Sequence, residues 1–357
     1  MPAKRLAPNM REIARQLGVS SSTVSRVLNG YTEGFSVRPD VRERILALVK
    51  TSGYKPNPFV RSVWAKKSML VAFLDYKQKW EGTSGTYEYA MVTMSNQLAR
   101  EGYQVSTNLM TEEEPEQYLP QWPVDGIAIP DVAHPARLTR IEKIGIPYVV
   151  INGVCGPHGS CVIVDEPQCC DLLFSHLYEL GHRRIAYYNA QGTTVKSRSH
   201  YSVAQRHDAY LGFLKRHRLK PLPGHDDYTL TPAAFLQLAV RDERATAIVV
   251  YGHFQALKLM RAAYDLGVAI PAQVGLACFD DVYPMQFLNP PVTCVALPTE
   301  AMGQLAAELL LRQMRDGQPG HGETHVLQGS LTVRDSVLPV AGMDGAGKPA
   351  GRRKGEA

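Results

Sequence analysis

The chain has 357 residues, of which 45% are hydrophobic and 20% are charged, so it is long enough for two or three domains with substantial cores. No run approaches ~18 consecutive apolar residues and no apolar stretch follows the basic N-terminus, so we expect neither a membrane span nor a secretory signal, and we place the protein in the cytoplasm. The net charge of +5 is uneven, because residues 1–67 hold thirteen Lys and Arg against four acidic residues, a balance of +9, whereas the remainder carries −4.

The first predicted helix runs from about Met10 to Leu17. Asn9 and Glu12 have the spacing of a capping box, in which the Asn side chain accepts from the third helical N–H and the Glu side chain reaches back. Gly18 ends the helix. A short helix that stops at a tight glycine turn predicts that a second helix follows closely.

Ser20 has the position of an N-cap for that second helix. Val24, Val27 and Leu28 then form an inward apolar stripe. The outward face carries small polar residues, an arginine and an asparagine, namely Ser21, Ser22, Ser25, Arg26 and Asn29. Two such helices form a helix-turn-helix, whose second helix enters the DNA major groove. An ordinary helical hairpin with a polar outer face is the alternative.

The division of roles among the polar residues follows from their chemistry. Serines 21 and 22 are small enough to let the helix approach the bases, but their hydroxyls read base edges weakly because they both donate and accept. Arg26 is the stronger reader, since a guanidinium can bind guanine in a bidentate manner. The basic balance of this segment also indicates a polyanionic partner, although a solvated basic face without a partner is the alternative.

A third helix is expected from Pro39, which suits a first helical position, to the stop at Gly53. Residues 59–65 can form one more short helix, but a segment of that length is unstable in isolation. Three small helices can bury one shared core, so we expect a DNA-binding domain over residues 1–57 and a hinge helix with its linker over residues 58–68.

Residues 9–68 resemble the DNA-binding headpiece and hinge of the lactose-repressor (LacI/GalR) family. The residues that carry the resemblance are Ile13, Ala14, Gly18, Val19, Ser20, the run Thr23-Val24-Ser25-Arg26-Val27-Leu28-Asn29, Arg42, Gly53, Tyr54, Pro56 and Asn57. The resemblance implies that Ser21 and Ser22 choose the operator and that Tyr54 and Asn57 touch the DNA backbone. The expected DNA-binding set is Ser21, Ser22, Thr23, Ser25, Arg26, Asn29, Tyr54, Asn57, Val63 and Trp64.

The last two residues of that set come from the hinge. In the family the hinge helix folds when two subunits meet on the operator, and it wedges an apolar residue, usually leucine, into a minor-groove step. Here that position is Val63, and a bulky Trp64 follows where the family has a small residue. Either side chain can unstack bases at a cost of roughly a few kcal/mol, so the sequence leaves open which of them is the wedge.

From Met69 onward, short apolar strands alternate with helical segments, which predicts a parallel α/β sheet. The order resembles the family core, which is similar to periplasmic sugar-binding proteins. The expected fold is therefore α/β: an all-α helix-turn-helix headpiece plus a two-subdomain periplasmic-binding-protein-like core with parallel sheets over residues 69–340. Crossovers between the subdomains are expected near Asp165, Pro291 and His321, and residues 341–357 are expected to form a disordered basic tail.

A small effector is expected between the two subdomains, at the carboxyl ends of the strands. The resemblance assigns effector contacts to Arg206 and Asp280, whose alternatives are a surface arginine and a turn residue. Asp75 ends the first core strand and faces the same cleft. Tyr210 lies one helical turn past Arg206 and can stack on a sugar ring, or else be a core aromatic. Gly252-His253 stands where most members have Asn-Asp.

The sequence gives no sign of catalysis, because nucleophile-elbow, zincin and P-loop motifs are absent and no glycine-rich dinucleotide motif follows a strand. The six cysteines lack zinc spacings and are expected as free thiols, and no cofactor or metal is expected. We expect a homodimeric transcriptional regulator, a repressor, that binds double-stranded operator DNA and a carbohydrate effector. The alternative is a solute-binding protein for transport or sensing, and the sequence does not decide repressor against activator.

Overall fold

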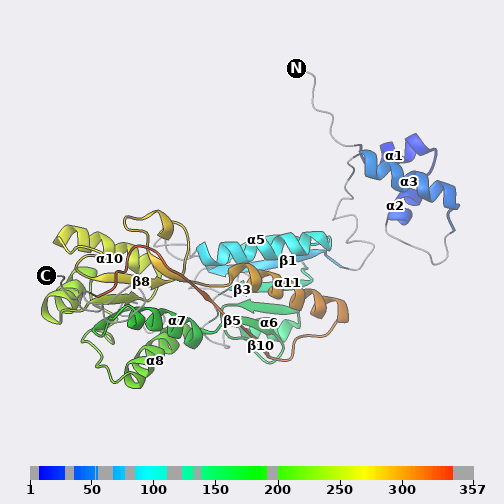
Figure 1. Cartoon of the computed structure of the whole chain (residues 1–357). Coiled ribbons are helices and arrows are strands. Elements are labelled where there is room, and N and C mark those ends of the chain that lie inside the picture. The colour runs from blue at the N-terminus through cyan, green and yellow to red at the C-terminus, as the bar shows by residue number, and fades with distance from the viewer. Residues whose placement is uncertain are drawn as a thin grey trace, which may run out of the picture. The chain divides into compact units, whose positions relative to one another are not determined.

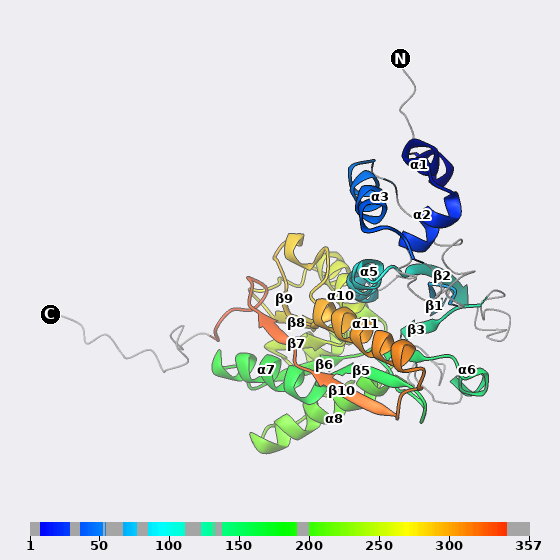
Figure 2. The same cartoon turned by 90° about the vertical axis from the view of Figure 1, so that its right-hand side faces the viewer.

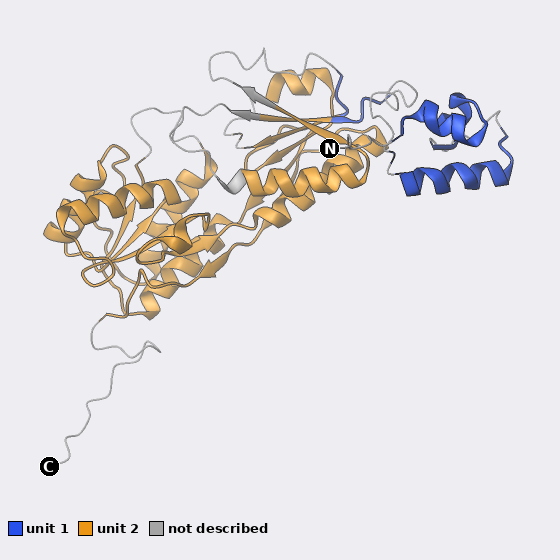
Figure 3. Cartoon of the chain, turned by 90° about the horizontal axis from the view of Figure 1, so that it is seen from above, with its two compact units in different colours: residues 1–70, 123–125 blue, residues 71–122, 126–357 orange. Residues whose placement is uncertain are grey.

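The computed structural model of the protein describes residues 8–28, 36–52, 54, 67–76, 85–110, 123–130, 132, 138–190 and 200–340. The expected hinge helix and the expected C-terminal tail lie outside these residues. Two compact units are present, one comprising residues 1–70 and 123–125 and the other the remainder of the chain (Figure 3). Within the described ranges no helix combines the length and the apolar character that crossing a membrane would require.

The first unit contains three helices, α1 (Met10–Leu17), α2 (Ser21–Leu28) and α3 (Pro39–Ser52). The predicted capping box is confirmed, since the Glu12 N–H donates to Asn9 Oδ1 at 3.0 Å and the Asn9 N–H donates to Glu12 Oε2 at 2.8 Å. Gly18 closes α1 with φ of 66°, a left-handed conformation that favours glycine. The turn into α2 therefore begins where the sequence predicts.

Apolar side chains from all three helices meet in one small core. Its buried members are Ile13, Ala14, Val24, Val27 and Ile45. The predicted N-cap of α2 is confirmed as well, because the Thr23 N–H donates to Ser20 Oγ at 3.0 Å. The inward stripe of α2 is thus buried, and the opposite face of the helix is available to solvent.

The second unit contains two sheets. The first sheet has the strand order β10-β5-β4-β3-β1-β2. Its strands are β1 (Leu70–Tyr76), β2 (Gln104–Met110), β3 (Gly126–Pro130), β4 (Tyr148–Ile151), β5 (Ser160–Val164) and β10 (Glu323–Leu327). Its helices are α5 (Gly85–Arg100), α6 (Thr139–Ile144) and α11 (Thr299–Asp316). Helices α5 and α11 lie side by side (Figure 2), and a Cβ at Gly303 would come within 2.3 Å of the Ala90 carbonyl oxygen, so glycine permits this close approach.

The second sheet has the order β11-β9-β8-β7-β6 and is parallel except for the antiparallel β11. Its strands are β6 (Ile185–Tyr188), β7 (Ala247–Val250), β8 (Gly275–Phe279), β9 (Thr293–Ala296) and β11 (Ser330–Thr332). The associated helices are α7 (Glu166–Glu179), α8 (Tyr201–Arg216), α9 (Pro232–Leu236), a π-helical segment (Gln237–Asp242), α10 (His253–Leu266) and a 3-10 turn (Met285–Phe287). Helices cover both faces of this sheet, with α10 on one side and α7 and α8 on the other (Figure 1). Parallel strands buried by helices on both faces are what the strand–helix alternation predicts.

Along the described strands, the chain passes between the two sheets three times. The first passage follows β5 at Asp165, where the family resemblance implies one. The second and third come later than the expected Pro291 and His321, because β9 still pairs with β8 and β10 still pairs with β5. They lie after Ala296 and after Leu327, so strand pairing, which the sequence does not display, sets where the chain crosses.

Candidate functional site

The outward face of α2 carries the residues predicted to read DNA. Ser22 and Arg26 are exposed, whereas Ser21, Thr23 and Ser25 are partly buried. Basic residues precede and follow this helix in the sequence. The following ones are exposed on the same unit: Arg11, Arg15, Arg38, Arg42, Arg44 and Lys50. Four predicted contacts, Asn29, Asn57, Val63 and Trp64, lie outside the described residues.

Two of the residues predicted to bind DNA, Thr23 and Tyr54, also make contacts within the first unit. The Thr23 hydroxyl is 2.8 Å from Ser20 Oγ, so Thr23 takes part in the cap of α2. Tyr54 is partly buried against the three-helix core, and this burial raises the pKa of its phenol. A phenol that packs by its ring can still present its hydroxyl to a phosphate.

In the second unit, Arg206 is almost fully buried, with 3% of its side chain exposed, and so is not the surface arginine of the alternative interpretation. Its guanidinium binds Glu166 in a bidentate manner, with Nε–Oε2 at 2.6 Å and Nη2–Oε1 at 2.9 Å. Nη1 donates to the Tyr251 carbonyl at 2.6 Å. Burial lowers the pKa of Arg206, but the charges of Glu166 and Asp280 raise it by more, so the guanidinium stays charged.

Asp280 follows β8 directly and has φ of 70°, a left-handed conformation that aspartate tolerates better than most residues. One carboxylate oxygen lies 3.7 Å from Arg206 Nη2 and the other 3.6 Å from His253 Nδ1. Burial raises the pKa of Asp280, but His253 and the charge of Arg206 lower it by more, so its pKa lies below the ordinary value. With 18% of its side chain exposed, Asp280 is an ionised acceptor at the carboxyl end of the sheet.

Hydrogen bonds connect the start of α8, from the second sheet, to the end of β4, from the first. His200 Nε2 lies 2.8 Å from the Asn152 carbonyl oxygen, and the Tyr201 hydroxyl donates to Asn152 Oδ1 at 2.6 Å. On the other side, Ser202 Oγ is 2.7 Å from the Tyr251 hydroxyl. A polar chain therefore runs from the first subdomain through the start of α8 to the strand end beside Arg206.

A cavity of about 280 Å³ lies against Asp280. Its wall combines α5 of the first subdomain with strand ends of the second and the segment after β9. The lining residues are Tyr89, Asp280, Asp281, Val282, Tyr283, Gln286, Leu297, Thr299 and Arg334. Arg334 donates to both carboxylate oxygens of Asp281 at 2.8 Å. The cavity lies between subdomains, where small-molecule sites commonly form.

Of the predicted effector residues, Asp280 and Arg206 come together, and Tyr210 does not join them. The prediction for Tyr210 as a ring that stacks on the effector is wrong, because its hydroxyl donates to the carbonyl of Ile185, the first residue of β6, at 3.0 Å. That end of the strand is opposite the carboxyl end where the cavity lies. Tyr210 is fully buried beside Phe174 and Tyr187. Asp75 lies on β1, and its side chain is outside the described part of the chain.

Sequence reasoning missed Glu166, Tyr89 and the pair Asp281 and Arg334. Glu166 directly follows Asp165, a predicted crossover residue, and an acid beside a strand end was a usable signal. Tyr89 had no such signal, because an aromatic residue within a helix is usually part of a core. The pairing of Asp281 with Arg334 depends on β11 lying next to β9, which only the fold establishes.

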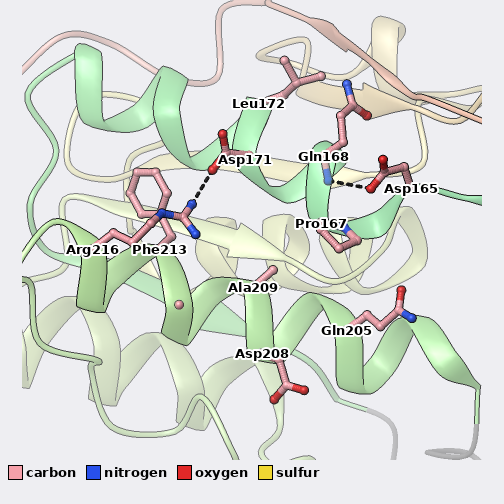
Figure 4. A pocket seen from close by; sticks show the side chains of 11 residues that line it. Asp165, Pro167, Gln168, Asp171, Leu172, Gln205, Asp208, Ala209, Phe213 and Arg216 are labelled. Atoms are coloured by element: carbon pink, nitrogen blue, oxygen red, sulfur yellow. Dashed lines mark hydrogen bonds and ion pairs between the residues drawn. The ribbon is translucent and has the colours of Figure 1, made fainter.

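A larger groove of about 930 Å³ lies between α7 and α8 (Figure 4). Several of its polar groups already have partners: Arg216 pairs with Asp171, and Asp165 Oδ1 accepts from the Gln168 N–H at 3.0 Å as the cap of α7. Among the described residues, no group of three His, Cys, Asp or Glu is arranged to hold a metal ion. All six cysteines are free thiols, as expected. The cavity beside Asp280 is therefore the better candidate for a ligand site.

Two family models match the chain. Residues 9–57 match the model described as bacterial regulatory proteins, lacI family, and residues 174–337 match a periplasmic binding protein-like domain. The first match covers the three-helix unit, and the second covers most of the second sheet with its helices and the two later passages between the sheets.

Relatives match nearly the whole chain. The chain is 28% identical to the HTH-type transcriptional regulator MalR of Streptomyces coelicolor, over 95% of this chain and 99% of that protein. It is 27% identical to GalS of Salmonella typhimurium, over 92% and 96%. Among solved structures, a CelR–cellobiose complex is 25% identical with a TM-score of 0.63, covering 92% of this chain and 99% of that one. A lac repressor dimer bound to operator and the anti-inducer ONPF has a TM-score of 0.68 at 21% identity, covering 93% and 100%.

Proposed function

The chain belongs to the lactose-repressor (LacI/GalR) family of ligand-responsive, DNA-binding transcriptional regulators, and we propose that it is a homodimeric repressor whose operator affinity depends on a carbohydrate bound beside Asp280. The observation that carries the proposal is the difference between the two faces of α2. Its Val24 and Val27 stripe is buried, and its Ser22 and Arg26 face is exposed on a basic unit.

On the DNA side, α2 enters the major groove with the serines near the bases, and Arg26 makes the strongest base contact. Tyr54 and Asn57 contact phosphates, and Val63 or Trp64 is the minor-groove wedge. The exposed cations of the first unit neutralise further phosphates, so affinity falls steeply with salt concentration. Two copies that read a pseudo-palindrome match the two-fold axis of a dimer.

On the effector side, Asp280 accepts hydroxyl hydrogen bonds, and Arg206 holds the wall beside it. The contacts of His200 and Tyr201 with Asn152 join the two subdomains, so a ligand between them shifts the equilibrium between closed and open forms. By linkage, effector and operator change each other's affinity by the same factor. The cellobiose of the CelR complex makes a neutral saccharide the first effector to test.

Exposed aromatic side chains of the second unit support a dimer. Tyr264 and Phe287 are both more than half exposed and do not line the cavity beside Asp280, so they are candidates for an association surface. We place the dimer in the cytoplasm, with no catalytic role. Sedimentation measures the dimer directly, and a monomer at micromolar concentration would contradict this part of the proposal.

The test selects bound duplexes from a random pool and then measures anisotropy of the selected duplex against random competitor. We expect a palindromic consensus, a strong preference over competitor, and weaker binding when a saccharide effector is added. A protein with no duplex preference at moderate salt refutes the DNA assignment. A saccharide that strengthens operator binding would make it a co-repressor and reverse the proposed sign.

A further inference from the structure

Glu166 occupies the face of Arg206 with which an arginine normally recognises an anion. The carboxylate accepts from Nε at 2.6 Å and from Nη2 at 2.9 Å, and none of its side chain is exposed. The remaining edge donates to the Tyr251 carbonyl. The ring centroids of Tyr251 and Phe279 lie 4.8 and 4.3 Å from the guanidinium carbon. Protein groups therefore surround the guanidinium. Glu166 accepts from Nε and Nη2, the Tyr251 carbonyl accepts from Nη1, and two aromatic rings lie near the guanidinium carbon.

This arrangement occupies the pair of N–H donors of Arg206 that an anionic effector would need. Arginine binds carboxylates and phosphates through two parallel N–H donors, and Glu166 takes both. The charged group beside Arg206 that solvent can reach is Asp280, an acid. Among the described arginine and acidic side chains here, one guanidinium faces two carboxylates, so the negative charge exceeds the positive by one.

Arg334, which lines the cavity itself, is neutralised in the same way. Arg334 binds Asp281 in a bidentate manner, and both side chains are largely buried. His253 lies at 3.6 Å from Asp280 and is itself buried. Each described arginine at the site thus has its own carboxylate, whereas the Asp280 oxygens and the exposed Tyr89 ring remain for hydroxyl groups and for the apolar face of a sugar.

We propose that Glu166 is a specificity-determining residue, which makes the site select uncharged polyhydroxylated ligands and reject their carboxylate and phosphate counterparts. The inference rests on the proposed function, since it takes the cavity beside Asp280 as the effector site. Glu166 does not touch the ligand. It acts through Arg206, because it accepts from the N–H donors and neutralises the positive charge that an anionic ligand would require.

The experiment compares matched neutral and anionic probes by isothermal titration calorimetry on the full chain. The pairs are cellobiose with cellobionate, glucose with glucuronate, and glucose with glucose 6-phosphate. Since an anionic ligand would lie beside the ionised carboxylate of Asp280, we expect the neutral member of any bound pair to bind at least about 100-fold more tightly. An anionic member that binds as tightly as its neutral partner overturns the proposal, and so does a failure of every neutral probe to bind.

The variant Glu166→Gln keeps the side-chain size and releases the charge of Arg206. We expect the neutral-to-anionic affinity ratio to fall by at least about tenfold, because the charge of Arg206 then offsets that of Asp280 and no longer that of Glu166. Asp171→Asn removes an exposed acid from the same helix and should leave the ratio unchanged. A Glu166→Gln ratio equal to that of the unmodified protein overturns the role of Glu166.

Circular dichroism first establishes that Glu166→Gln folds. If it does not, the ratio measured on the unmodified protein decides the proposal alone. Operator binding is measured in parallel without any probe. If the protein binds its operator but shows no preference for neutral probes, the role of Glu166 in specificity is refuted and the proposed function as a transcriptional regulator is not. If the protein shows no operator preference, the proposed function itself is refuted.

Discussion

The buried pair of Arg206 with Glu166 should be coupled far more strongly than a surface pair on the same helices. Arg206→Met leaves a fully buried carboxylate without its two charge-assisted hydrogen bonds, and breaking such a pair costs about 3–5 kcal/mol. Glu166→Met leaves the guanidinium with Asp280 at 3.7 Å and should cost a similar amount. The double variant buries two apolar side chains of similar volume and should cost much less than the sum, because neither charge is stranded.

Urea unfolding followed by circular dichroism measures the free energy of unfolding of the unmodified protein, the two single variants and the double variant. At about 2–4 °C per kcal/mol for a domain of this size, the single variants should also melt on the order of 10 °C lower. Arg216 with Asp171 is the matched control. It joins the same two helices, but its side chains are 59% and 57% exposed, so its cycle should give less than about 1 kcal/mol. Equal coupling in the two cycles would refute the argument from burial.

Three further predictions concern residues on both units. Arg26→Ala should abolish operator preference by anisotropy while circular dichroism and sedimentation stay unchanged, and retained preference would count against its role in reading bases. Tyr210→Phe leaves the Ile185 carbonyl without its donor and should cost about 1–3 kcal/mol in urea unfolding, with probe affinity unaltered by calorimetry; a loss of affinity would return Tyr210 to the effector site. The pKa of Asp280 is lowered in the folded state, so its contribution to stability is present above its unfolded pKa of about 3.9 and is lost as pH falls through the folded value. The melting temperature of Asp280→Asn should therefore fall less steeply than that of the unmodified protein between pH 6 and pH 3, and parallel curves would contradict the assignment.

The first unit was largely predictable, because its signals are local. A capping box, an N-cap serine and a left-handed glycine each act within a few residues, so Asn9 with Glu12, Ser20 and Gly18 indicated the bounds of α1 and the start of α2. The inward stripe of α2 followed from helical periodicity alone. The alternation of strands and helices after Met69 likewise predicted a parallel α/β sheet, and the family resemblance implied its division into two subdomains.

The contacts at the effector cavity were not predictable in the same way, because they join residues far apart in the chain. The sequence by itself determined that Asp280 follows a strand and that the core is α/β, and the family resemblance assigned Arg206 to the same site. Only the tertiary structure decided that Glu166 fills the fork of Arg206, that Tyr210 points to the far end of β6, and that the chain crosses after Ala296 rather than near Pro291. The physical reason is that charge pairing and strand order depend on which segments become neighbours in space, and neither a local propensity nor a periodicity encodes that neighbourhood.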